Sequence, residues 1–229
     1  MVNLLFDYDG TLHDSLAIYA PAVREAYDAL AARGLAAAGP PDPETIRQWV
    51  GLPPAEMWDR FQPDLSPSEK QACSARVGER MLELVREGRA RLYDGVPEVL
   101  DHLKARGVRM LLLSNCPISY LQAHTAQFGL ERWFDGLYCG EQFGYRPKHA
   151  IFPELRDRWP GEFLVIGDRA QDMEIALRNR QSAVGCLYGY GSPDELSGAD
   201  WLARSPLDLP ACAERFLETA KDQTCRPGP

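Results

Sequence analysis

Short apolar runs alternate with helical patterns through the second half of the chain. The apolar runs, predicted to be buried strands, lie at residues 108–113, 163–166 and 183–188. The helical patterns lie at residues 97–106, 117–128, 148–158 and 170–180. Strands that alternate with helices build βαβ units, and hence a parallel sheet covered on both faces. The sequence therefore predicts an α/β fold with a Rossmann-like core and helices on both faces of the sheet.

A further apolar run, residues 2–7, is predicted to be a strand of the same sheet. It ends in two aspartates one residue apart, Asp7 and Asp9, which are followed by Gly10 and Thr11. Two carboxylates this close repel each other unless a cation or a shared proton intervenes. A divalent metal is the simplest solution, and Mg²⁺ prefers oxygen ligands.

The segment between this strand and the others shows no strand pattern. Apolar residues from Leu16 to Leu30 recur at steps of four and three, which predicts one face of an amphipathic helix. Further helices are expected at residues 43–61 and 67–88, interrupted by prolines. We therefore predict that residues 15–90 form a small all-helical cap domain, inserted after the first strand.

The residues outside the predicted cap are divided between the α/β core domain and a C-terminal tail. Residues 1–14 and 91–220 are expected to form the α/β core domain, with residues 200–203 as a short edge strand. The tail, residues 221–229, is polar and ends in Pro and Gly, so we expect it to be disordered.

Composition narrows the class of protein. The formal net charge of −8 argues against nucleic-acid binding, which needs a basic surface, and the 45% hydrophobic content suffices for a core. No apolar run is long enough to span a membrane, and no signal peptide is expected. The six cysteines show no CxxC pairing, which favours reduced thiols. We predict a cytoplasmic protein, monomeric or homodimeric, without nucleic-acid or membrane partners.

Polar residues follow two further strands at their ends. Ser114 and Asn115 follow residues 108–113, where capping of the next helix is an alternative role for Ser114. Asp168 and Asp172 follow residues 163–166 and, four positions apart, share one face of a nascent helix. Helix capping is the alternative for these acids too. Because open parallel sheets bind ligands beyond the carboxyl ends of their strands, we expect these side chains to converge.

These motifs resemble those of the haloacid dehalogenase-like (HAD) hydrolases. The stretch Asp7-Tyr8-Asp9-Gly10-Thr11 is similar to the family's first motif, Asp-x-Asp-Gly-Thr. The resemblance implies that Asp7 is the nucleophile that attacks phosphorus and that Asp9 is the general acid/base. A carboxylate nucleophile divides the displacement into two steps, and a neighbouring acid protonates the leaving group and then activates water.

The other motifs extend the resemblance. Gly167-Asp168-x-x-x-Asp172 is similar to the fourth motif, which implies that Asp168 and Asp172 hold Mg²⁺ together with Asp7 and the carbonyl of Asp9. Phosphate-binding contacts are implied for residues of the second motif and the first turn, namely Ser114, Asn115, Thr11 and Gly10.

The third motif supplies a cation and has two candidates. Lys148 opens a predicted helix, whereas Arg146 precedes Pro147 in the place of a family Lys-Pro pair. Either could neutralise Asp7 and the transferring phosphoryl group. We favour Lys148 because Lys is a compact point charge, while the fork of Arg demands a particular geometry.

The resemblance is to the phosphoglycolate-phosphatase-like subgroup and includes residues 184–196. It implies a Mg²⁺-dependent phosphatase acting on a small phosphate monoester through an aspartyl-phosphate. A phosphomutase of the β-phosphoglucomutase type stays open, as does a non-catalytic phospho-accepting or signalling domain. In the cap, the turn at residues 50–53 and its neighbours are candidates for substrate contact, with ordinary helix packing as the alternative: Arg47, Trp49, Trp58 and Arg60.

The histidines show neither HxH nor HExxH spacing. Surface or packing roles are therefore expected for them rather than metal ligation. His13 lies within the first motif and is a candidate for lining the entrance of the site.

Overall fold

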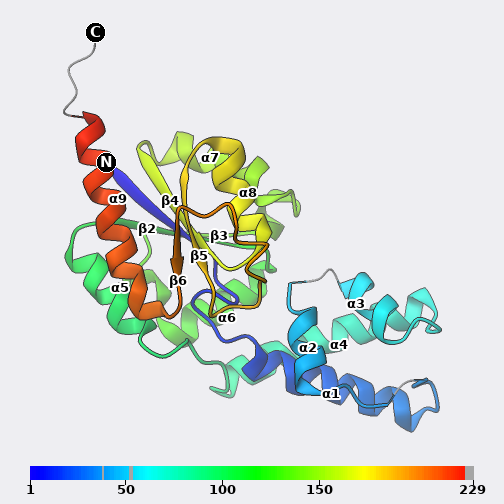
Figure 1. Cartoon of the computed structure of the whole chain (residues 1–229). Helices are drawn as coiled ribbons and strands as arrows, with labels where there is room; N and C mark the ends of the chain where they lie inside the picture. The colour runs from blue at the N-terminus through cyan, green and yellow to red at the C-terminus, as the bar shows by residue number, and fades with distance from the viewer. Residues whose placement is uncertain (38, 52–53, 225–229) are drawn as a thin grey trace. The chain divides into compact units, whose positions relative to one another are not determined.

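The computed structural model describes residues 1–37, 39–51 and 54–224, and the chain divides into two compact units. One is an α/β unit that combines Met1–Asp14 with Leu92–Pro229. The other is a helical unit, Ser15–Arg91, which interrupts the first in sequence. Figure 1 shows the consequence for the sheet, since the blue first strand lies among strands from much later in the chain.

The α/β unit is built on a parallel sheet of six strands in its described part, in the order β3-β2-β1-β4-β5-β6. The strands are β1 (Val2–Phe6), β2 (Arg109–Ser114), β3 (Gly136–Cys139), β4 (Glu162–Gly167), β5 (Ser182–Cys186) and β6 (Trp201–Ala203). Leu5 of β1 pairs with Leu111 on one side and with Val165 on the other. The predicted α/β fold is confirmed.

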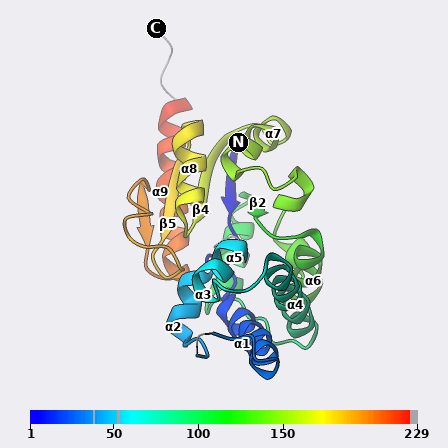
Figure 2. The same ribbon diagram turned by 90° about the vertical axis from the view of Figure 1, so that its right-hand side faces the viewer.

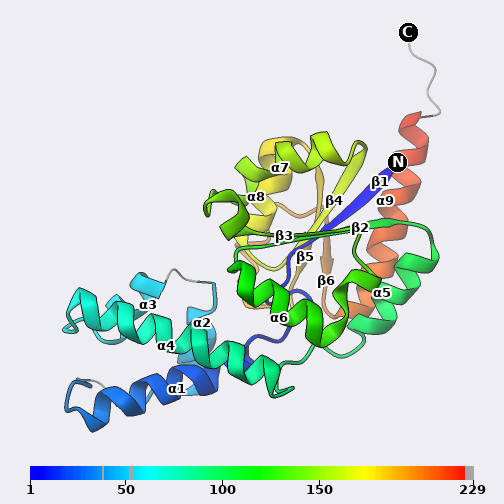
Figure 3. The same ribbon diagram turned by 180° about the vertical axis from the view of Figure 1, so that it is seen from behind.

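Helices cover both faces of this sheet, which explains why its strands are almost continuously apolar. One face packs against α7 (Lys148–Arg158) and α8 (Ala170–Asn179), with Leu5, Leu111 and Val165 in that core. The other helices of the unit, visible on the opposite face in Figures 1 and 3, are α5 (Val96–Ala105), α6 (Ile118–Phe128) and α9 (Leu209–Thr224).

The strand order places the functional edge of the sheet. Successive strands step outward in one direction from β1 to β3 and in the other from β4 to β6, so the order reverses between β1 and β4. Such a reversal leaves a crevice at the carboxyl ends of the two strands. The amide of Asp7 donates to the carbonyl of Ile166 at 2.8 Å, so the two strands stay paired up to the point where the loops begin.

The helical unit contains α1 (Leu16–Ala32), α2 (Pro43–Trp49), α3 (Pro54–Phe61) and α4 (Pro67–Arg86), of which α1 and α4 run side by side (Figure 2). The candidate substrate residue Trp58 is fully buried in it, and the Trp49 and Phe61 rings lie 4.8 Å apart. The Arg60 guanidinium binds the Glu56 carboxylate. The two tryptophans therefore pack inside the helical unit, whereas Arg60 forms an exposed ion pair. Residues 52–53 of the expected cap turn lie outside the described residues.

The structure corrects the expected limits of several elements. Residues 221–224 are helical and not disordered, because α9 continues to Thr224. The helix is anchored by the buried Ala213 and Phe216, and a helix that is already formed extends readily by further residues. The strand β3 was not expected, since it has only four residues and starts with glycine. Residues 225–229 lie outside the described part. None of the described helices is long and apolar enough to cross a membrane.

The central packing can be tested by truncation. Leu111 is fully buried between β1 and β3, whereas Leu177 on α8 is 78% exposed. We expect Leu111→Ala to lower the free energy of unfolding by roughly 2–5 kcal/mol, because it leaves a cavity in the core. The matched Leu177→Ala should stay within about 0.5 kcal/mol of the wild type. Urea denaturation followed by circular dichroism measures both, and equal effects would contradict the packing described.

Candidate active site

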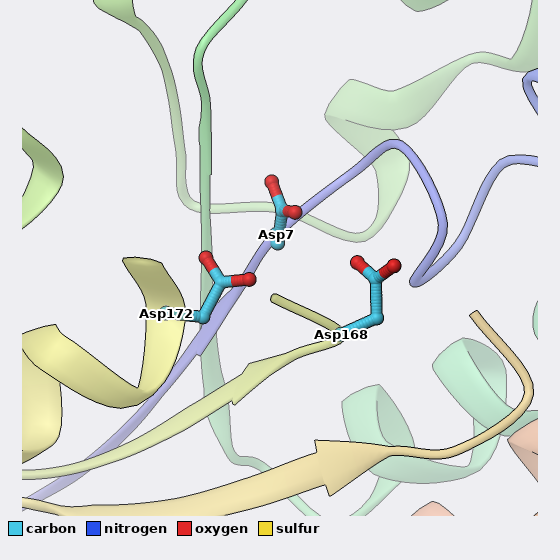
Figure 4. A group of neighbouring side chains, drawn as sticks. All are labelled: Asp7, Asp168 and Asp172. Atoms are coloured by element: carbon cyan, nitrogen blue, oxygen red, sulfur yellow. The ribbon is translucent and has the colours of Figure 1, made fainter. Parts of the chain in front are cut away.

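Three carboxylates meet at the carboxyl edge of the sheet, where the strand order reverses. Asp7 follows β1, Asp168 follows β4, and Asp172 lies in the first turn of α8. Each offers an oxygen within 4.8 Å of those of the other two, and Figure 4 shows the side chains turned toward a common space. All three are at most 8% exposed. We refer to them as the acidic triad.

Lys148 is the cation that faces the acidic triad. It stands at the first position of α7 and is 4% exposed. Its Nζ donates to Oδ1 of Asp7 at 2.6 Å and to Oδ1 of Asp172 at 2.7 Å. Arg146, the other candidate for this position, instead pairs with Glu154 and has a side chain that is 46% exposed. The contacts therefore place Lys148, and not Arg146, at the site.

The charges of this cluster do not balance. Burial, and then the charge of Asp172, raise the pKa of Asp7 well above its usual value, and the same two causes raise the pKa of Asp168 to about 7. Burial alone would lower the pKa of Lys148, but the charges of Asp172 and Asp7 raise it instead. One cation against three buried carboxylates leaves excess negative charge. A set of oxygen donors with this excess fits Mg²⁺.

The turn that follows β1, which contains Gly10 and Thr11, holds the side chain of Asp168 in place. Gly10 has a φ of +87°, a conformation that residues with a side chain rarely adopt. A Cβ added to it would also lie 2.3 Å from Oδ2 of Asp168, so both the backbone conformation and the space require glycine. Thr11 Oγ1 donates to Oδ1 of Asp168 at 3.2 Å, and the Tyr190 amide donates to Oδ2 at 2.7 Å. The amides of Gly10 and Thr11 donate to carbonyls within the turn. These contacts give Gly10 and Thr11 a role in positioning a carboxylate; their predicted contact with phosphate stays a prediction.

Ser114 ends β2, directly beside β1, and is 2% exposed. The helix α6 begins at Ile118 with Pro117 as its N-cap and no side-chain capping bond, so the alternative of Ser114 as that cap is wrong. The side-chain Nδ2 of Asn115 donates to Oε1 of Gln171 at 2.5 Å, which ties the loop after β2 to α8. For Asp172 the capping role is confirmed, since its Oδ2 accepts from the Arg169 amide at the start of α8. Its Oδ1 binds Lys148, and its role in holding a metal stays a prediction.

Asp9 has different surroundings from the acidic triad. Its Oδ1 accepts hydrogen bonds from His13 Nδ1 and from the Tyr120 hydroxyl, both at 2.9 Å, and its side chain is 28% exposed. Burial would raise the pKa of Asp9, but the hydrogen bond and charge of His13, with the bond from Tyr120, bring it below its usual value. Two carboxylates one residue apart thus have pKa values shifted in opposite directions.

The structure places His13 in the interior, which agrees with a packing role and not with the alternative of lining the entrance. His13 and His124 are both fully buried, and their ring centroids lie 4.5 Å apart. Burial, and then His13, lower the pKa of His124 to about 3, so its ring is neutral. Burial raises the pKa of Tyr8, whose hydroxyl lies 2.8 Å from Nδ1 of His124. Tyr8 is therefore the donor in this bond.

The sequence reasoning missed Tyr120 and His124, although a signal for both exists. These two residues and Phe128 recur at steps of four along α6, so they lie on one face of that helix. An aromatic and histidine-rich helix face is unusual for a helix that covers a sheet of leucines and valines. That composition was the available sign of a polar contact under α6.

Comparison with known proteins agrees with this geometry. The family of haloacid dehalogenase-like hydrolases matches residues 2–178. The chain belongs to this family. A 5'-nucleotidase of Pseudomonas aeruginosa is 31% identical over 202 residues, which are 85% of this chain and 86% of that protein. A phosphoglycolate phosphatase of Synechococcus elongatus is 27% identical over 217 residues, or 91% of this chain and 95% of that protein.

A solved structure supports the fold of this HAD-like hydrolase. The crystal structure of a "predicted phosphoglycolate phosphatase" of Haemophilus somnus superposes with a TM-score of 0.78 at 24% identity, covering 92% of this chain and 96% of that one. The predicted HAD-like hydrolase of the phosphoglycolate-phosphatase-like subgroup is confirmed. The alternative of a non-catalytic receiver-type domain is wrong, because the matched family is one of hydrolases.

Removing the buried cation should destabilise this HAD-like hydrolase. In metal-free protein at about pH 8, we expect Lys148→Met to lower the free energy of unfolding by roughly 3 kcal/mol, because Asp7 and Asp172 lose their counter-ion. The loss should shrink at about pH 5, where buried carboxylates of raised pKa take up protons. Thermal unfolding at both pH values measures the effect. Arg146→Met, which removes an exposed ion pair, is the control and should change little.

Proposed function

We propose that this chain is a Mg²⁺-dependent phosphatase that hydrolyses a small phosphate monoester through an aspartyl-phosphate on Asp7. The observation that carries the proposal is the contrast between the two aspartates of the first motif. Asp7 lies against a buried cation and two further carboxylates, while Asp9 accepts hydrogen bonds from His13 and Tyr120. Different partners for the two neighbouring carboxylates suit a site in which one acts as the nucleophile and the other exchanges protons. The relatives named above are phosphoric monoester hydrolases, in agreement with the predicted enzyme class.

In the first step, a carboxylate oxygen of Asp7 attacks the phosphorus of the ester in line with the bond to the leaving oxygen. A bond forms between Asp7 and phosphorus, and the bond from phosphorus to the ester oxygen breaks. Asp9 gives its proton to the departing oxygen, so the product leaves as a neutral alcohol. Lys148 holds Asp7 in place and offsets the negative charge that three carboxylates and a phosphate bring together.

In the second step, water attacks the phosphorus of the aspartyl-phosphate. Asp9, now a carboxylate, accepts the proton of that water, and the bond between Asp7 and phosphorus breaks. Inorganic phosphate is released and both aspartates return to their initial states. Ser114, at the end of the neighbouring strand, is the candidate for binding a phosphoryl oxygen throughout.

The metal belongs with the residues that carry the excess negative charge. Asp7 and Asp168 would ligate it together with the carbonyl of Asp9, with Asp172 holding it through water or supporting the ligands. When bound, Mg²⁺ would neutralise charge on the transferring phosphoryl group. Thr11 contributes by donating to Oδ1 of Asp168, and Gly10 contributes by leaving room for Oδ2.

The substrate class is open to direct measurement. The relatives act, by their names, on phosphoglycolate and on nucleoside 5'-phosphates, so both belong in a panel with sugar phosphates. Release of inorganic phosphate under identical conditions ranks them by kcat/KM. A mutase would instead move the phosphoryl group within a sugar phosphate without releasing it, which chromatography of the sugar products distinguishes.

Replacement of the nucleophile is the sharpest test of the mechanism. We expect Asp7→Asn to reduce hydrolysis of p-nitrophenyl phosphate by roughly a thousandfold or more, because an amide cannot form the aspartyl-phosphate. Asp157→Asn, an exposed position of α7, is the matched control and should retain full activity. Acid-quenched wild-type protein should carry one phosphoryl group on Asp7 by mass spectrometry. Undiminished turnover by Asp7→Asn would refute the assignment.

Dependence on Mg²⁺ can be tested through both the activity and the melting temperature of the protein. We expect EDTA to abolish turnover and added Mg²⁺ to restore it. Mg²⁺ should also raise the melting temperature of the wild type in a concentration-dependent way, because a ligand bound only to the folded state stabilises it. Asp168→Asn should lose this rise while Asp157→Asn keeps it. A melting temperature insensitive to Mg²⁺ in the wild type would contradict the proposed metal site.

A further inference from the structure

We propose that His13 and Tyr120 are positioning residues that hold the carboxylate of Asp9 in the orientation required for proton transfer. The inference rests on the proposed function, in which Asp9 is the general acid/base. Neither residue touches the acidic triad, so their effect on the reaction passes through Asp9.

Both donors converge on a single atom. His13 Nδ1 and the Tyr120 hydroxyl each lie 2.9 Å from Oδ1 of Asp9, and they are 3.4 Å from one another. One donor alone would allow the carboxylate to rotate about its last bond. Two donors from different elements, one in the loop after β1 and one on α6, fix that rotation.

His13 is itself fixed by packing on several sides. The Tyr8 ring is stacked on it at 5.3 Å with an interplanar angle of 10°, and the His124 ring meets it edge-on at 4.5 Å. Phe128 closes a further side at 6.5 Å. The backbone holds the residue as well, since the His13 amide donates to the Tyr8 carbonyl and the His13 carbonyl accepts from the Gly10 amide, both at 2.9 Å.

The hydrogen-bond pattern sets the direction of each bond. The Nε2 of His13 is buried and has no hydrogen-bond partner among the described residues, so Nδ1 carries the proton that Asp9 accepts. The Tyr8 hydroxyl bonds to His124, which leaves Tyr120 as the hydroxyl donor to Asp9. Both donors are buried, and hydrogen bonds from buried groups are stronger than the same bonds in water.

The consequence for the reaction is specific. Because Oδ1 of Asp9 already accepts two hydrogen bonds, the proton exchanged with the leaving group and with water belongs on Oδ2. Loss of either donor would release the carboxylate to rotate, and proton transfer would slow while substrate binding stays as it is. A purely structural role would instead affect all substrates and KM together.

The experiment compares two substrates that differ in their need for an acid. The p-nitrophenolate group leaves without protonation, whereas an alkyl phosphate such as glycerol phosphate needs a proton on the departing oxygen. The variants are Tyr120→Phe, which removes only the hydroxyl, His13→Leu, which removes the donor, and His13→Asn, which retains a donor near the Nδ1 position. Phe128→Leu is the control, because Phe128 packs against His13 without bonding to Asp9.

For Tyr120→Phe and His13→Leu, we expect kcat/KM for the alkyl phosphate to fall by roughly tenfold or more, with kcat/KM for the aryl phosphate within about twofold of the wild type. The inhibition constant of inorganic phosphate should not change. His13→Asn should recover much of the loss, and Phe128→Leu should show no difference between the two substrates.

Equal losses on both substrates, or wild-type kinetics in Tyr120→Phe, would overturn the inference. Because Tyr120→Phe is nearly isosteric, it decides the question even if His13→Leu fails to fold. The proposed function is rejected if the wild type hydrolyses neither substrate or if Asp7→Asn remains active. In that case the inference, which depends on it, is rejected as well. An active wild type with an inactive Asp7→Asn and unaffected Tyr120→Phe would reject the positioning role alone.

Discussion

The ion pairs of Lys148 with Asp7 and Asp172 are the interaction on which the site depends. Three carboxylates with so little exposure would repel one another and lose most of their hydration if no cation lay among them. Lys148 can approach both oxygens because α7 starts at the carboxyl edge of the sheet, where the strand order reverses. Its single charge is not enough for three acids, and this deficit is what makes the cluster a suitable metal site.

Asp7 and Asp9, for which we propose different roles, lie only two positions apart in the sequence. Asp7 directly follows β1 and lies close to Asp168 and Asp172, whereas the Tyr8 hydroxyl bonds to His124 on α6. The tight turn that follows brings Asp9 and His13 together, because amides of the turn donate to the carbonyls of Tyr8 and His13. The pattern of a strand that ends in a turn thus places the proposed nucleophile and the proposed acid/base in unlike surroundings.

The elements that could be predicted from the sequence are those with a strong local pattern of apolar residues. The long apolar runs that became β1, β2, β4 and β5 were identifiable because both faces of a central strand are buried. The short strand β3 and the last turn of α9 were not predicted, since tertiary packing and not local periodicity stabilises them. For the third motif, sequence spacing left Lys148 and Arg146 as alternatives. Their contacts, one with the acidic triad and the other with an exposed glutamate, distinguish them.

By itself, the sequence determined the α/β class, the family and the set of acidic residues, because strand ends and motif spacing are local properties of the chain. Only the tertiary structure decided which cation faces Asp7 and which donors hold Asp9. Two of those contacts join residues more than a hundred positions apart, Asp7 with Lys148 and Asp9 with Tyr120. The same applies to His13, whose burial depends on a helix face that lies far away in sequence and packs against it only in the folded protein.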